Sequence, residues 1–159
     1  MDWTERYLPK RLQLLGLSSG SLDTTYSLDP VGNVSGTTDA SGHVLEATIA
    51  ALCDLGARRE DLIAWLGPAI GSTRFEVGAD VRDAFCADDD GAAACFAPHA
   101  PAKWRADLYA LARRRLTRGG VTQVSGGGCC TFTDEARFFS HRRDPGTGRM
   151  AATVWLARE

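Results

Sequence analysis

The feature that most constrains the fold is an amphipathic segment from residue 105 to residue 118 that ends at two glycines. Leucine and alanine recur on one side of this segment, whereas the three arginines of 113–115 fall mostly on the other side. This spacing predicts a helix with one buried face, and Gly119 and Gly120 favour its end. The β-branched residues of 121–125 follow directly, and they predict a strand.

Two further helices are predicted upstream. Apolar residues recur every three or four positions over 44–55, with Gly56 placed to end that helix, and a second amphipathic pattern covers 76–85. Between them, the run 62–66 is short, wholly apolar and followed by a Gly-Pro turn. Such a run predicts a strand that is buried on both faces.

The C-terminal residues predict a strand pair. Residues 150–157 show alternation and β-branched content, and the turn-forming residues of 144–148 would fold 138–142 back against them. Helices and strands interleave along the chain, which indicates the α+β class. With 159 residues and 44% hydrophobic content, the chain is long enough to bury one sizeable core.

Residues 1–43 differ from the rest in being rich in Ser, Thr, Gly and Asp, which predicts turns and short strands. Within them, 26–33 followed by 39–42 resembles one tyrosine-aspartate repeat of the RHS type. A plain turn-rich loop explains the same residues, and both interpretations stay open because repeat units need stacked neighbours for stability.

Charge and cysteine usage exclude several classes of partner. The formal net charge of -2 supplies no whole-molecule field for nucleic acid or an anionic membrane. No run approaches the roughly eighteen apolar residues of a membrane span. Five cysteines, an odd number, with no secretory signal at the start, favour a reducing compartment. We therefore expect a cytoplasmic protein with neither nucleic-acid nor membrane partners.

Several sequence blocks together bring a family into view. They are Ala64-Trp-Leu-Gly-Pro-Ala-Ile-Gly71 with Phe75-Glu-Val-Gly78, then Asp107-Leu108, then Gly128-Cys-Cys-Thr131 leading to Phe138-Phe-Ser-His-Arg-Arg-Asp144 and Thr147-Gly-Arg-Met150. In this order they resemble the YfiH family of polyphenol oxidases, purine nucleoside phosphorylases and peptidoglycan editing factors. The resemblance implies that 44–159 is the carboxyl-terminal half of a YfiH-like domain and that 1–43 is foreign to it.

The resemblance implies a fold and a set of activities. The fold is part of an α/β/β/α layered sandwich. The activities are phosphorolysis of purine nucleosides, deamination of adenosine and oxidation of phenols. The expected small-molecule partners are therefore inorganic phosphate and a purine nucleoside, or a phenolic compound. The expected protein class is a truncated enzyme of this family, and whether this chain is active by itself stays open.

The resemblance also implies a metal site that this chain lacks. Family members hold zinc or copper through two histidines and one cysteine, in the motifs Gln-Val-His-Gly, Ala-Asp-Cys and His-Ala-Gly-Trp-Arg-Gly. None of these motifs occurs in the sequence, and Val34 stands at the place of one ligand histidine. We therefore expect no cofactor and no metal ligand in this chain.

Three arginines form the candidate anion site. Arg142, Arg143 and Arg149 flank the turn predicted at 144–148, and a guanidinium can hold phosphate through two parallel hydrogen bonds. Pairing with nearby acidic residues, such as Asp134 or Asp144, is an alternative that stays open.

Three further residues are candidate catalytic groups. Cys130 follows a glycine run, and a reactive thiol there needs a cationic neighbour or a base, for which His141 is the candidate. A buried structural cysteine is the alternative. Glu76 and Asp107 match family positions, which implies a proton carrier or a ribose hydrogen-bond acceptor. Carboxylates that favour helix N-termini are the alternative for both.

Two other patterns carry no metal prediction. Cys86, Cys95 and His99 lack a fourth ligand at a zinc-site spacing. The acidic run 88–91 lacks the further ligands of a calcium loop and predicts a solvated loop.

The main alternative to an enzyme is a non-catalytic remnant or interaction module. Without the other half of a sandwich, the apolar faces of 62–66 and 150–157 would lie uncovered, which predicts a homo-oligomer. A binding segment of an RHS-like surface protein is a third hypothesis, and it rests on 26–42 alone.

Overall fold

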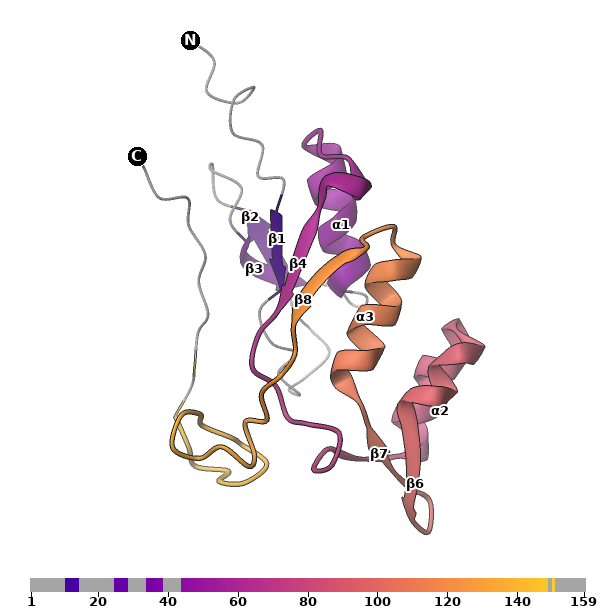
Figure 1. Ribbon diagram of the computed structural model, residues 1–159, viewed down its shortest axis with the longest axis vertical. Helices are drawn as coiled ribbons and strands as arrows, with labels where there is room; N and C mark the ends of the chain where they lie inside the picture. The colour runs from indigo at the N-terminus through magenta and orange to yellow at the C-terminus, as the bar shows by residue number, and fades with distance from the viewer. Residues whose placement is uncertain (1–10, 15–24, 29–33, 39–43, 149, 151–159) are drawn as a thin grey trace. The chain divides into compact units, whose positions relative to one another are not determined.

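The computed structural model describes residues 11–14, 25–28, 34–38, 44–148 and 150. These residues divide into two compact units, each assembled from separated parts of the sequence. Unit 1 comprises the described segments up to Trp65 together with Arg115–Ser125. Unit 2 comprises Leu66–Arg114 and the segment from Gly126 onward. Figure 1 labels most of the elements of both units.

The strands of the first part of the chain are short. Their bounds are β1 (Arg11–Leu14), β2 (Thr25–Leu28) and β3 (Val34–Thr38). β2 and β3 form an antiparallel pair with Thr25 opposite Thr38. β1 belongs to a separate sheet of order β1-β4-β8, with β4 (Ile63–Leu66) in the middle and β8 (Gln123–Gly126) at the other edge. The RHS resemblance of this segment stays a prediction.

Helix α1 (Val44–Asp54) agrees with the helix predicted over 44–55. Leu45, Ile49 and Leu52 are buried along one side, as the spacing predicts. The helix ends where Gly56 adopts a φ of 93° and its N–H donates to Cys53 O at 2.9 Å. A positive φ at this position is the usual reason for glycine just past a helix end.

Helix α3 (Leu108–Arg118) begins later than predicted. Residues 103–106 are the strand β7 (Lys103–Ala106), so the prediction of helix from Arg105 is wrong over its first residues. The physical reason is that β7 lies between two other strands and its backbone groups are used in the sheet. The predicted glycine stop is confirmed, because Gly120 has a φ of 86° and Val121 N donates to Leu116 O at 2.9 Å.

A three-stranded antiparallel sheet of order β5-β7-β6 organises unit 2. Its outer strands are β5 (Glu76–Gly78) and β6 (Phe96–Ala100). Val77 stands opposite Trp104, and Phe96 stands opposite Ala106. The helix predicted over 76–85 is therefore wrong at its start, since 76–78 pair with β7 and helix α2 covers Ala79–Asp88.

The acidic run 88–91 is more ordered than a solvated loop. Asp88 ends α2, and a 3-10 helix, η2 (Asp90–Cys95), begins two residues later. Asp89 accepts a hydrogen bond from Gly91 N at 3.1 Å and pairs with Arg114 of α3. The prediction of a solvated loop is therefore corrected. The local composition could not reveal the ion pair, because Asp89 and Arg114 lie far apart in the sequence.

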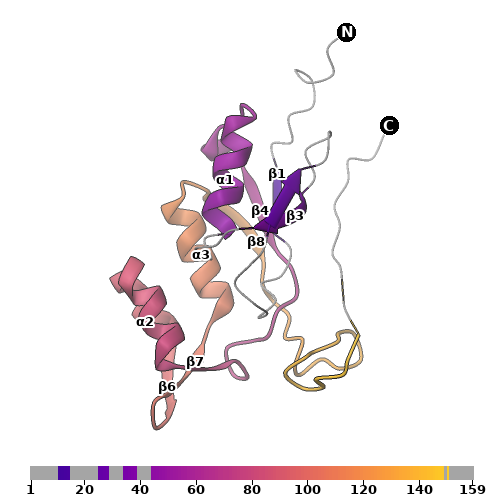
Figure 2. The ribbon, with the colours of Figure 1, turned by 180° about the vertical axis from the view of Figure 1, so that it is seen from behind.

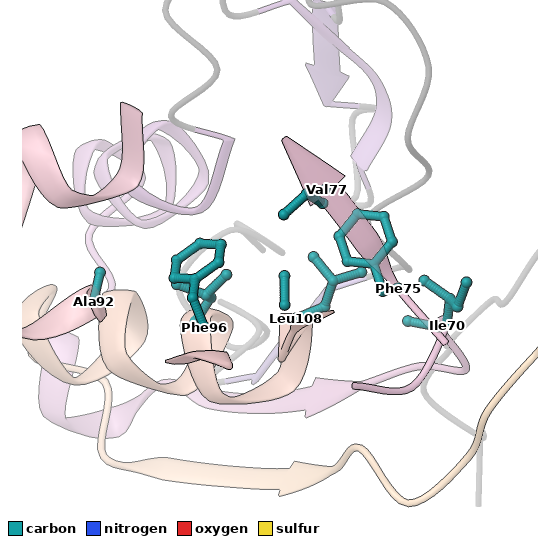
Figure 3. Packing of buried hydrophobic residues seen from close by; sticks show 9 residues of the cluster. Ile70, Phe75, Val77, Ala92, Phe96 and Leu108 are labelled. Atoms are coloured by element: carbon teal, nitrogen blue, oxygen red, sulfur yellow. The ribbon is translucent and has the colours of Figure 1, made fainter. Parts of the chain in front are cut away.

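The core of unit 2 lies between its sheet and its helices. Figure 3 shows the buried side chains from close by, and Figures 1 and 2 show α2 alongside β6 and β7. The cluster consists of apolar residues of β5, β6, β7, η2 and α3 and of the loop after β4, namely Ala69, Ile70, Phe75, Val77, Ala92, Phe96, Ala106, Leu108 and Leu111. Burial of this apolar surface is the main stabilising contribution in this unit.

Two strand predictions need correction. In β4, Leu66 and Ala64 are buried but Trp65 is 37% exposed, so the strand is not buried on both faces. Residues 138–142 do not form a strand, because the amides of Arg143 and Asp144 both donate to Ser140 O, which makes a turn. The strand predicted over 150–157 lies outside the described residues apart from its first position.

The hairpin between β6 and β7 turns at Ala102, which has a φ of 55°. A non-glycine residue in this region carries a steric cost. Within the described residues, no helix combines the length and the apolar content needed to cross a membrane.

Candidate functional site around Cys130

Two loops of unit 2 meet at Cys130. One loop follows β4 and the other follows β8, and a parallel bridge joins Ala69 to Cys130. Thr131 N donates to Ala69 O at 2.9 Å, and Gly127 N donates to Leu66 O at 3.0 Å. These backbone hydrogen bonds fix the register of the two loops against each other.

The hydroxyl of Tyr109, in the first turn of α3, lies between the same two loops. It accepts a hydrogen bond from Ala69 N at 2.7 Å. It lies 2.8 Å from Cys129 O and 3.2 Å from Gly67 O, and it donates its proton to one of these carbonyls. Burial raises the pKa of Tyr109, which keeps the hydroxyl protonated. The sequence prediction missed Tyr109, although an aromatic residue with a polar tip directly follows Asp107-Leu108.

The Cys130 thiol sits against the amide of Gly71, whose N–H donates to Sγ at 3.2 Å. Burial raises the pKa of this thiol, but hydrogen bonds from the Thr133 side chain and from the amides of Gly71, Thr133 and Phe132 outweigh it. The pKa of Cys130 is therefore below its ordinary value. A lower pKa increases the fraction of thiolate, the nucleophilic form.

His141 is the base predicted for this thiol, and that role stays a prediction. The strand pair that was expected to bring His141 to Cys130 is absent, and His141 Nδ1 instead lies 3.1 Å from Pro145 O. Nearby N–H and O–H donors stabilise the thiolate directly, although they do not accept the proton that the thiol loses.

Glu76 begins β5 and stands opposite Arg105 of β7. Its carboxylate lies 3.3 Å from His99 Nε2, and Arg105 Nη2 lies 2.8 Å from the same nitrogen. Glu76 therefore belongs to a half-exposed polar group on the sheet and not to a helix N-terminus. Sequence spacing gives no signal for this group, because its members come from three strands.

The two described arginines of the candidate anion site, Arg142 and Arg143, point to different surroundings. The guanidinium of Arg142 lies 5.2 Å from the centre of the Phe75 ring, and its Nη1 donates to Glu76 O at 2.9 Å. Arg142 is exposed, so its remaining N–H groups face solvent. A guanidinium stacked on an aromatic ring is held in a defined orientation.

Arg143 is 17% exposed and binds its own loop. It donates to Thr131 O at 2.9 Å, to Phe132 O at 3.1 Å and to Phe138 O at 3.0 Å. Its Nε also donates to Asp144 at 2.8 Å. These four bonds use most of the five N–H groups of a guanidinium. Arg149 lies outside the described residues, so an arrangement of all three arginines stays a prediction.

Asp107 precedes α3 and caps it. Its Oδ1 accepts a hydrogen bond from Ala110 N at 2.9 Å, as expected for an N-cap carboxylate. This capping bond explains the residue type at this position, and the catalytic role of Asp107 stays a prediction.

The side chains of the described residues do not fit the metal site that the family resemblance implies. No three His, Cys, Asp or Glu side chains of the described residues come together as a ligand group. Cys86 and Cys95, considered above for zinc, pack against the hydrophobic cluster, and burial raises the pKa of Cys95. A raised thiol pKa disfavours the thiolate that metals bind.

The site thus defines a mixed helix-and-strand domain in which a glycine-rich loop carries a hydrogen-bonded thiol. Residues 32–157 match the family model described as multi-copper polyphenol oxidoreductase laccase, and the chain belongs to this family.

Curated relatives and solved structures agree with this assignment. The chain is 54% identical over 114 residues to purine nucleoside phosphorylase PA4543 of Pseudomonas aeruginosa, covering 71% of this chain and 46% of the relative. It is 51% identical over 113 residues to purine nucleoside phosphorylase YfiH of Escherichia coli, covering 71% and 45%. The crystal structure of protein NMB0706 of Neisseria meningitidis superposes with a TM-score of 0.67 at 46% identity, covering 73% of this chain and 48% of that chain. The chain spans about half the length of these proteins.

Proposed function

We propose that this chain contributes to a purine nucleoside phosphorylase, with inorganic phosphate and a purine nucleoside as substrates. The observation that supports this proposal is the identity of 51% to 54%, over 71% of the chain, to proteins of that name. We further propose a cytoplasmic location, since all five cysteines are free thiols.

In this reaction a phosphate oxygen attacks C1′ of the ribose, and the bond from C1′ to the purine nitrogen breaks. The electron pair of that bond leaves with the purine, which takes up a proton, and the products are ribose 1-phosphate and the free base. The transition state carries positive charge on the ribose. It therefore needs a bound anion, a proton carrier and negative charge near the sugar.

Arg142 is the proposed phosphate ligand. Its stacking on Phe75 and its bond to Glu76 O support this role, because they orient the guanidinium while other N–H groups face solvent. The role proposed for Arg143 is to order the segment that carries Arg142, as its bonds to Thr131 O and Phe138 O indicate. Arg149 completes the clamp in this proposal.

Cys130 and Glu76 are the proposed groups next to the sugar. The thiolate of Cys130 stabilises the positive charge of the transition state, and Glu76 carries the proton to the leaving purine. The turn after Gly71 supports placing them in one site, because Phe75 N donates to Gly71 O at 3.1 Å, Gly71 N contacts Cys130, and Glu76 follows directly. No step is assigned to a metal, since the described side chains offer no ligand group.

The test is release of adenine from adenosine in the presence of phosphate. We expect phosphate-dependent adenine and ribose 1-phosphate, with a loss of at least about tenfold in Arg142→Ala, because a bidentate oxyanion contact is removed. Arg82→Ala is the matched control, since Arg82 also stacks on an aromatic ring, that of Trp104, but belongs to α2 and not to the segment 127–148.

Absence of adenine release would overturn the proposal if it persists when the amino-terminal half of the Escherichia coli relative is added in trans. Release of inosine instead of adenine would indicate deamination, the other reaction that the resemblance implies.

A non-catalytic interaction module is the second candidate, and it is favoured by the lack of a metal-ligand group among the described side chains. In that case we expect no stoichiometric zinc or copper in the purified chain, together with self-association in sedimentation experiments at micromolar concentration. One tightly bound ion per chain, or a compact monomer, would contradict this candidate.

A further inference from the structure

We propose that Tyr109 is a positioning residue for Cys130: its hydroxyl holds the loop after β4 so that the Gly71 amide points at the Cys130 thiol. This inference rests on the proposed function of Cys130. The geometry that carries it is a chain of contacts within unit 2, from α3 through the two loops to the sulfur atom.

The hydroxyl is bonded to both loops at once. It accepts from Ala69 N at 2.7 Å on one loop and lies 2.8 Å from Cys129 O on the other. Ala69 is also the residue bridged to Cys130. Ala69 on one loop and Cys130, the residue after Cys129, on the other are therefore held within one hydrogen-bonded group.

The Tyr109 ring is fixed as well as its hydroxyl. A Cβ added at Gly127 would lie 3.0 Å from Tyr109 Cδ1, so the backbone of the glycine-rich loop passes directly against the ring. One turn further along α3, Arg113 Nη2 donates to Gly126 O at 2.6 Å. The α3 face that carries Tyr109 and Arg113 thus holds the glycine-rich loop, and Tyr109 also reaches the loop after β4.

The last contact is tight. Gly71 N donates to Cys130 Sγ at 3.2 Å, and a Cβ added at Gly71 would lie 3.1 Å from Cys130 Cβ and 3.2 Å from Sγ. A small shift of the loop after β4 therefore changes the N–H to sulfur distance, on which the stabilisation of a thiolate depends. Without the hydroxyl, Ala69 N loses its acceptor, and the backbone bonds from Thr131 N to Ala69 O and from Gly127 N to Leu66 O hold the loop without its anchor to α3.

The charged and titratable groups near the thiol are few among the described residues. They are Cys129 and Tyr109, Arg74 stacked on the Phe132 ring, Arg143 on the carbonyl of Thr131, and the ion pair Asp134–Arg137 that follows the loop. Arg143 is held by carbonyl oxygens and Arg137 by Asp134. Burial raises the pKa of Cys130 and the hydrogen bonds to its sulfur lower it, with a net lowering.

The experiment measures the rate at which iodoacetamide alkylates Cys130, as a function of pH, with peptide fragmentation to separate Cys130 from Cys129. In Tyr109→Phe we expect alkylation at neutral pH to slow about threefold to tenfold and the midpoint of the rate profile to move to higher pH, because less thiolate is present. The rate at the alkaline plateau should stay unchanged. Arg113→Gln is the matched control, since it removes a bond to the glycine-rich loop and leaves the Ala69 contact in place.

An unchanged pH profile in a folded Tyr109→Phe protein would overturn the proposal. If this variant does not fold, amide hydrogen exchange in the unmodified chain decides. The proposal expects slow exchange at Ala69 and Gly71, and an Ala69 amide that exchanges as fast as that of exposed Gly128 would overturn it.

The alkylation result does not depend on turnover. If Cys130→Ser keeps full phosphorolysis while Tyr109→Phe shifts the alkylation profile, the proposed role of Cys130 fails and the positioning role stands. If Cys130→Ser abolishes phosphorolysis and Tyr109→Phe leaves the alkylation profile unchanged, the positioning role alone fails.

Discussion

Two regions of unit 2 reach order by different means. The segment from β5 through α3 is built of regular elements around an apolar cluster that includes Phe96 and Leu111. The segment 127–148 contains turns, and side chains such as Tyr109 and Arg143 hold its carbonyl groups. In this chain hydrophobic burial therefore fixes the framework, whereas a few polar side chains fix the candidate site.

The largest expected effect on the free energy of unfolding comes from replacing a phenylalanine by alanine, and it should differ between the two regions. Phe96→Ala should lower the free energy of unfolding by about 3–5 kcal/mol, because Phe96 is buried in the cluster and its removal leaves a cavity. Phe139→Ala should cost only about 0.5 kcal/mol, since Phe139 is 50% exposed. Urea unfolding measures both values. Similar losses for the two variants would break the distinction between the regions.

The next effect tests the polar region with adjacent arginines. Arg143→Ala should lower the free energy of unfolding by about 1.5–3 kcal/mol, because three carbonyl groups and Asp144 lose a charged donor. Arg142→Ala removes one such bond from an exposed side chain and should cost about 0.5 kcal/mol. Thermal unfolding of both variants checks the order. A larger loss for Arg142→Ala would show that the polar contacts do not order this segment.

For phosphate binding we expect the opposite order of the two arginines, with Arg142 mattering more than Arg143. We expect phosphate to bind with a dissociation constant of about 1 mM, near 4 kcal/mol, and Arg142→Ala to weaken it at least about tenfold. Arg142→Lys should restore binding only in part, because an ammonium lacks the two parallel donors. A titration followed by chemical shifts provides the measurement. Shifts spread evenly over the arginines of 113–115 would indicate screening by salt.

The smallest effect concerns acid. The hydrogen bond from Arg137 lowers the pKa of Asp134, so the carboxylate stabilises the fold above the ordinary aspartate pKa of about 3.9 and this contribution disappears as the pH falls through the lower folded value. Asp134→Asn should therefore melt slightly below the parent at pH 6 and together with it near pH 2. Glu135→Gln serves as the control, and an equal pH dependence for both variants would contradict this assignment.

Elements with long periodic patterns were predictable from the sequence. α1 and most of α3 were found from apolar spacing and from the glycines that end them. The starts of two predicted helices were wrong because Glu76–Gly78 and Lys103–Ala106 are strands too short to show alternation. β5 pairs with β7 about thirty positions away, and β7 also pairs with the adjacent β6, so pairing in the sheet overrides local preference. β6 was also missed, and Pro98 within it suits its place at the sheet edge.

The candidate site was less predictable than the fold. The glycine run points to Cys130, whose role stays a prediction, and the donor that reaches its sulfur comes from Gly71, 59 positions away. Arg142 and Arg143 are adjacent and chemically identical, so the sequence does not distinguish the arginine that faces solvent from the one that binds carbonyl groups. Only the direction of each side chain separates them.

The separation between Gly71 and Cys130 also bears on the order of folding. The hairpin of β6 and β7 joins neighbours in the sequence and closes a short loop, which is a fast event, whereas the amide-to-thiol contact spans 59 positions and has to wait for the chain between them to collapse. We expect the Cys130 thiol to keep the reactivity of an unfolded cysteine until late in folding. Pulses of an alkylating reagent at successive times during refolding would then show, by the loss of Cys130 alkylation, when the two loops dock.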